Sequence, residues 1–233
     1  MDRKELYQNV RKAYRLAYEV QHSIVEMVDY IRTRIKTVDY AGKQVFSDPL
    51  SKRKGVEEGY VTDYIGTDMW SWDYFPTYMY MYYFTGIPTE TKYSCFSIVQ
   101  VMDDGFLGTT NVDSAPETKD FNTPAESESY VLLSFAIWNK NRRAIWFEYD
   151  GTDVIQDEKA EIMRISQVLK GNGGEPYVKK VPDAAFVVSR INLESMCSKA
   201  EVDHVLQAFA DLVEQETGYQ ILLDETEEEN THP

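Results

Sequence analysis

The stretch LYQNVRKAYRLAYEVQHSIVEMVDYIR, residues 6–32, decides how this protein is built, because it carries one apolar stripe at helical spacing. Apolar side chains recur at alternating steps of four and three residues, at Leu6, Val10, Ala13, Ala17, Val20, Ile24, Met27 and Ile31. Tyr14, Val28 and Ile35 widen this stripe. The spacing predicts a single long amphipathic helix over residues 3–36.

A helix of that length would span about 50 Å, which is longer than a small domain. Two arrangements follow. In the first, the whole helix packs on the protein's own sheet. In the second, part of the helix overhangs and pairs with a second copy of the chain, which would make the protein a homodimer.

Downstream of residue 76 the pattern changes from helical to strand-like. Runs rich in β-branched and aromatic residues, bounded by turn-forming residues, lie at 77–85, 93–102, 130–139, 144–149 and 184–191. The short stretch 139–142 is expected to close an antiparallel hairpin between the third and fourth of these runs. Residues 37–68 contain turn signals and short apolar pieces, and we expect loops there with at most one hairpin.

Two further helices are predicted. Ile155, Ile162, Ile165 and Leu169 recur at helical spacing, and this helix ends at the glycine-rich turn 171–174. Ser198 and Glu201 form a capping-box pattern that opens the last helix, which should end at Gly218. The sequence therefore predicts an α+β protein with a long N-terminal helix, a mostly antiparallel sheet of about five or six strands, and two further helices packed on it. Residues 1–223 form one domain in this interpretation, and residues 224–233 form a disordered acidic tail.

Composition and charge restrict the function. The formal net charge of −15 opposes non-specific binding to phosphate backbones, so nucleic acid is not an expected partner. No run of about 18 uncharged apolar residues occurs, which argues against a membrane span. The first fifteen residues carry five basic side chains without an apolar run and so do not resemble a signal peptide. We expect a cytoplasmic protein.

Carboxylates are the strongest catalytic candidates in the sequence. Asp103 and Asp104 end one predicted strand, and Glu148 and Asp150 lie at the end of another. Acids at neighbouring strand ends can hold Mg²⁺ through oxygen ligands, with Asp104, Glu148 and Asp150 as the metal-binding set. Both Asp104 and Asp150 precede glycine, however, so turn formation also explains them.

The order of helix, strands, helix and strand resembles the restriction-endonuclease-like nucleases. That resemblance implies a magnesium-dependent nuclease or phosphoester hydrolase, in which an acid is followed on the next strand by an acid-x-Lys motif. Here Gly151 follows the Glu148-Tyr149-Asp150 triplet, so the lysine is missing and Lys140 would have to substitute for it. Fold resemblance without the motif is a weak argument for an activity.

Aromatic residues crowd the stretch MWSWDYFPTYMYMYYFTG, residues 69–86, and Pro76 divides it. After the proline, both faces of the predicted strand are apolar, which is typical of a core strand. Before the proline, Trp70, Trp72 and Tyr74 alternate with polar residues, and rings of this kind anchor interfaces and ligand pockets. The sequence thus favours a non-catalytic protein without cofactor or metal. It would bind an unknown protein or small molecule through these rings and the long polar loop at 103–129.

Overall fold

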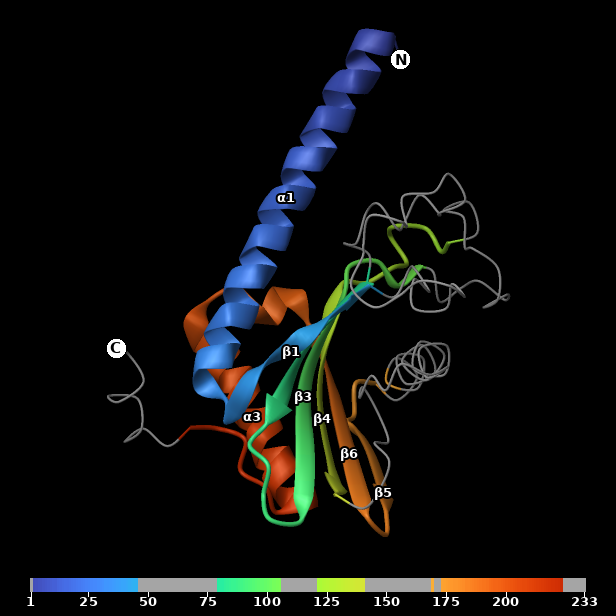
Figure 1. The fold of residues 1–233 in the computed structure, drawn as a ribbon. Helices are drawn as coiled ribbons and strands as arrows, with labels where there is room; N and C mark the ends of the chain where they lie inside the picture. Colours follow the sequence, from blue (N-terminus) through green and yellow to red (C-terminus); the bar gives the residue numbers. More distant parts are fainter. Residues whose placement is uncertain (1, 46–78, 106–120, 141–168, 170–172, 224–233) are drawn as a thin grey trace, which may run out of the picture.

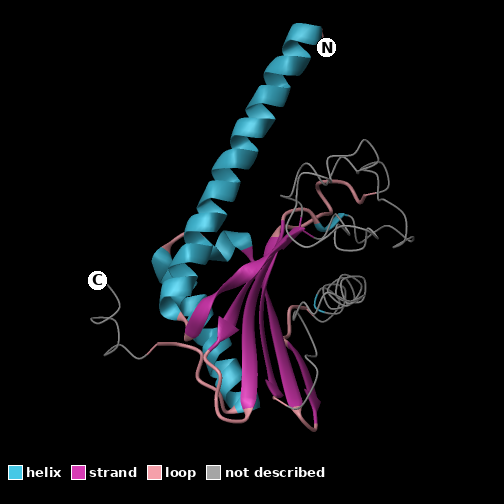
Figure 2. Ribbon diagram, in the orientation of Figure 1, coloured by secondary structure: helices cyan, strands magenta, loops and turns pink. Residues whose placement is uncertain are grey.

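A computed structural model describes residues 2–45, 79–105, 121–140, 169 and 173–223. The described chain begins with one long helix, continues through six strands and ends with a short 3-10 helix and an α-helix (Figures 1 and 2). These elements are α1 (Arg3–Arg34), β1 (Thr37–Val45), β2 (Met79–Gly86), β3 (Lys92–Val101), β4 (Tyr130–Asn139), β5 (Tyr177–Val181), β6 (Ala184–Asn192), η6 (Leu193–Met196) and α3 (Lys199–Thr217).

The strands form one sheet in the order β1-β2-β3-β4-β6-β5, and every neighbouring pair is antiparallel. β4 lies in the interior and is hydrogen-bonded along its length to β3 on one edge and to β6 on the other. The expected hairpin between residues 130–139 and 144–149 is therefore wrong, because β4 has no free edge to offer. The strand that follows β4 in the sheet is instead β6, which is more than forty residues away in the sequence. Short-range turn signals do not reveal such a pairing.

The region expected to be loops begins with a strand. β1 pairs with β2 through a register that shifts twice, between Thr37 and Asp39 and between Tyr40 and Gly42. Such bulges interrupt the alternation of side chains on which a strand prediction depends. The rest of the predicted loop region, 46–68, lies outside the described residues.

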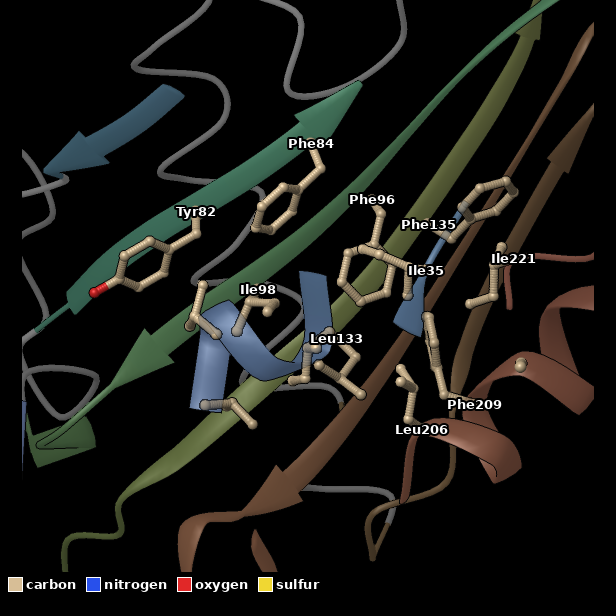
Figure 3. Close-up of a cluster of buried hydrophobic side chains, with 14 of the residues drawn as sticks. Ile35, Tyr82, Phe84, Phe96, Ile98, Leu133, Phe135, Leu206, Phe209 and Ile221 are labelled. Atoms are coloured by element: carbon tan, nitrogen blue, oxygen red, sulfur yellow. The ribbon is translucent and has the colours of Figure 1, made fainter. Parts of the chain in front are cut away.

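The main core lies between one face of the sheet and the two α-helices. Ile24, Met27, Val28 and Ile31 of α1 belong to one buried cluster with the inward side chains of β2, β3 and β4. Figure 3 shows Leu206 and Phe209 of α3 in the same cluster, near Leu133 of β4. The rings of Phe96 and Phe209 meet edge to face at 6.0 Å between centroids. Tyr82 and Phe84, from the aromatic stretch after Pro76, belong to this core as expected.

Both ends of α3 match the sequence signals. The Ser198 hydroxyl accepts a hydrogen bond from the Glu201 backbone N–H at 3.3 Å and lies 2.8 Å from the Glu201 carboxylate. Gly218 ends the helix with a φ of 71°, a left-handed conformation that glycine adopts without strain.

The structure confirms the α+β class, the long N-terminal helix, the antiparallel sheet and the C-terminal helix. The predicted helix at 155–169 lies outside the described residues except for Leu169, which is helical and buried. The predicted strand at 144–149 and the acidic tail at 224–233 also lie outside them. Among the described helices, none is long and apolar enough to cross a membrane.

Candidate functional site

The long helix α1 leaves the body of the protein at Gln21. The amide of this residue donates to the Tyr82 hydroxyl at 2.9 Å and accepts from the buried Gln100 amide at 2.8 Å. This polar contact joins α1 to β2 and β3. Residues 3–19 of α1 extend beyond the other described elements (Figure 1), over about 26 Å at 1.5 Å per residue. We call residues 3–19 the overhang.

The apolar stripe of α1 runs through both parts of the helix, but its burial changes at Gln21. On the body side, Ile24 and Ile31 keep 4% and 0% of their surface exposed. On the overhang, Leu6 and Val10 keep 41% and 39% exposed, although they occupy the same helical face. The stripe is thus half core and half uncovered surface.

Three large side chains flank the stripe on the overhang. Tyr7, Tyr14 and Leu16 are 60%, 62% and 67% exposed. In a heptad numbering with Val10 and Ala17 at position a, both tyrosines fall at position e and Leu16 falls at position g, the positions that border a helix–helix seam. The helical spacing of apolar residues places Tyr14 in the stripe but not Tyr7 and Leu16. Their positions e and g in the heptad are the sequence signal that could have identified them as flanking residues.

Charge is segregated along α1. Residues 2–15 carry Arg3, Lys4, Arg11, Lys12 and Arg15 against Asp2 and Glu5, a net charge of +3. Residues 16–30 carry Glu19, Glu26 and Asp29 with no lysine or arginine, a net charge of −3 with His22 neutral. The helix is therefore basic over residues 2–15 and acidic over residues 16–30, and Arg32 and Arg34 follow in its last turn.

A groove of about 480 Å³ lies where α1 meets η6 and α3, at the foot of the overhang. Its apolar walls come from both sides of the junction. They are formed by Val20, Ile24, Met27, Leu193, Met196 and Val202. Cys197, which is exposed, and Lys199 lie on its rim. The volume is in the range of ligand pockets and is also enough for a few side chains.

Tyr30 ties α1 to α3 beside this groove. Its hydroxyl lies 2.8 Å from each carboxylate oxygen of Asp203, and the Arg34 guanidinium lies 3.6 Å from the same carboxylate. The Lys199 ammonium sits 5.2 Å from the centre of the Tyr30 ring. Burial raises the pKa of Tyr30, the hydrogen bond and charge of Asp203 raise it further, and Arg34 opposes the shift. The groove was not predicted, because it forms between elements far apart in the sequence.

Asp103 and Asp104, the two candidate catalytic acids in the described residues, make contacts at the ends of the 103–129 loop. Asp103 accepts a hydrogen bond from the Gly105 backbone N–H at 2.8 Å, which is a turn contact. Asp104 is fully buried and accepts from the Glu128 backbone N–H at 2.8 Å, while its own N–H donates to the Glu128 carbonyl at 3.2 Å. These contacts close the described ends of the loop onto each other.

Lys140 is not brought to this pair of acids. Lys92 at the start of β3 pairs with Asn139 at the end of β4, whereas Val101 pairs with Tyr130. Lys140 therefore follows the opposite end of the two strands from Asp103 and Asp104, about 30 Å away at 3.3 Å per residue. Glu148 and Asp150 lie outside the described residues. Within the described part of the chain, no cluster of three or more Asp, Glu, His or Cys side chains is placed to hold a metal ion.

Trp70, Trp72 and Tyr74 also lie outside the described residues, as does the centre of the loop at 106–120. Their predicted binding role stays a prediction.

Comparison with known proteins gives a family assignment without an activity. A family model described as PM0109 matches residues 1–219 of the chain. No curated protein and no solved structure matches the chain.

Proposed function

The chain belongs to the PM0109 family, and we propose that it is a non-catalytic assembly protein that binds a second copy of itself through the overhang of α1. One observation carries the proposal. The apolar stripe that packs into the core between Ile24 and Ile31 continues without interruption to Leu6, where the described chain offers nothing to cover it.

The exposed stripe has the form of a helix-pairing seam. Its side chains repeat in alternating steps of four and three, the spacing with which two helices pack as a coiled coil. Burying apolar surface contributes about 25 cal/mol per Å², so a seam of four helical layers with flanking tyrosines offers several kcal/mol to a partner. A projecting helix without that partner leaves this surface in water.

Charge argues for a second copy as the occupant. A partner helix must offer an apolar stripe and must also complement a basic half followed by an acidic half. The α1 helix of another copy has both properties. This support is independent of the continuity of the stripe.

Light scattering coupled to size-exclusion chromatography, over a range of protein concentrations, tests the proposal. We expect a dimer for the natural sequence and a monomer for the double variant Leu6→Glu with Val10→Glu, which places two acids on the seam. The matched control is Gln8→Glu with Tyr18→Glu, which adds the same two charges on the outer face of the overhang and should leave the dimer intact. A natural-sequence protein that stays monomeric at high concentration overturns the proposal.

Two further hypotheses remain as proposals, and each depends in part on residues outside the described part of the chain. Ligand binding by Trp70, Trp72 and Tyr74 is compatible with an assembly role. The magnesium-dependent hydrolase finds less support, because Asp103 and Asp104 are engaged in loop contacts and Lys140 lies at the other end of the strands. A cytoplasmic location also remains an expectation.

A further inference from the structure

We infer that the two α1 helices of the dimer run antiparallel, and that the first turn of each enters the groove at the foot of the other. This inference rests on the proposed function, since it specifies how the second copy is seated. Charge, heptad geometry and the position of the groove support it.

The charge pattern distinguishes the two orientations. A parallel pair would place the net +3 of residues 2–15 beside the same +3 of the partner, and the −3 of residues 16–30 beside the same −3. An antiparallel pair reverses both contacts and places each basic half beside an acidic half. Like charges along a helix pair are destabilising and opposite charges are stabilising, so the antiparallel orientation is favoured.

Heptad geometry then sets the register. In an antiparallel pair, residues at position a pack against residues at position d of the partner. The register that pairs Val10 with the partner's Val20 also pairs Ala13 with the partner's Ala17, and it brings Leu6 level with the partner's Ile24, which is packed in its own core and 4% exposed.

The large flanking side chains also find cover in this register. The two-fold axis that relates the two α1 helices in this register passes at the level of Arg15, between Tyr14 and Leu16. Each Tyr14 then lies beside the partner's Tyr14 on one side of the seam, and each Leu16 lies beside the partner's Leu16 on the other. A parallel pair would set Leu16 beside the partner's Gln21, whereas in the antiparallel register Tyr7 takes that neighbour and Leu16 packs on Leu16.

The groove marks where the partner's helix ends. Leu6 of the partner comes level with Ile24, which forms part of the groove wall together with Met27 and Met196. Leu6 is the apolar side chain of that first turn, and the volume of about 480 Å³ is enough to hold it, while Arg3 comes level with Met27. The partner's first turn thereby covers an apolar groove that the described part of one chain leaves open.

The exposed Cys197 on the groove rim provides a direct test. The variant Leu6→Cys, incubated with oxidised glutathione, should form an intermolecular disulfide from residue 6 to the partner's Cys197, located by peptide mass spectrometry. A disulfide requires Cα atoms within about 7 Å, so the bond reports the groove contact. Adding Cys197→Ser should abolish the crosslink, and Gln8→Cys, on the outer face, should crosslink far less.

The outcomes separate the two proposals. A disulfide between the two copies of residue 6 that survives Cys197→Ser would show a parallel pair and overturn the orientation. A dimer of the Leu6→Cys protein without any crosslink to Cys197 would overturn the groove contact. In both of these cases self-assembly stands. A monomeric natural-sequence protein removes the proposed function together with this inference.

Discussion

The two halves of α1 present the same sequence pattern in opposite surroundings. From Val20 onward the stripe is packed against the sheet and α3, while from Leu6 to Ala17 it projects away from them. The spacing, the residue types and the helical conformation are shared, and only the neighbours differ. A periodic stripe therefore indicates which face of a helix is to be covered, and the rest of the fold determines how much of it the chain covers itself.

The difference between the two halves of α1 is tested most directly by truncating one stripe residue in each half and comparing the two losses of stability. Ile31→Ala, in the core, should lower the free energy of unfolding by about 2–5 kcal/mol, because it leaves a cavity among packed side chains. Val10→Ala, on the overhang, should change it by less than about 0.5 kcal/mol at concentrations where the protein is monomeric. Urea unfolding followed by circular dichroism measures both. Equal losses would mean that the overhang packs on its own chain.

The boundary between the halves can be tested at Gln21. Gln21→Ala removes the hydrogen bonds that this residue makes with Tyr82 and with the fully buried Gln100 amide. We expect a loss of about 1–2 kcal/mol of unfolding free energy, since a buried amide deprived of a partner is costly. Ser23→Ala, whose exposed hydroxyl donates to the Glu19 carbonyl of its own helix, is the control and should be nearly neutral. A neutral Gln21→Ala would show that α1 is not anchored there.

The smallest of these effects is expected at Tyr30, where the packed half meets α3. Tyr30→Phe should cost about 0.5–1.5 kcal/mol near neutral pH through loss of the hydrogen bond to Asp203. Because the pKa of Tyr30 is raised in the folded state, its contribution is present below the unfolded pKa of about 10 and is lost as pH rises through the folded pKa. The natural sequence should therefore lose more stability above pH 10 than Tyr30→Phe does. Tyr7→Phe, on the overhang, should follow the natural sequence instead.

Local signals predicted α1 and α3 well. The stripe placed α1 at residues 3–36 against an observed Arg3–Arg34, and the capping box and Gly218 placed both ends of α3. These features depend on residues three or four positions apart, which interact directly on a helix. The groove beside Tyr30 could not be predicted, because it depends on how α1, η6 and α3 come together.

Strand pairing was predicted less well, for a related reason. The limits of β4 matched the sequence pattern, but its neighbours did not, since a strand's hydrogen-bonding partner is set by the whole sheet. The edge strands were the hardest to find. β1 is interrupted by bulges, and β5 is a five-residue strand with two lysines, a composition typical of a protected sheet edge. Strand pairing also determines that Asp103 and Lys140 follow opposite ends of two paired antiparallel strands, which their sequence positions alone do not reveal.

The continuity of α1 from core to overhang also bears on how fast copies meet. An isolated helix of fewer than about 12–15 residues is marginal in water, because its first turn is costly to nucleate. Here the packed turns between Val20 and Arg34 are an existing nucleus, and each overhang residue needs only to propagate it, up to the Asp2 cap that accepts from the Glu5 N–H at 2.7 Å. Two copies would therefore meet with preformed helices, and the encounter would proceed as docking of ordered surfaces rather than as coupled folding and binding.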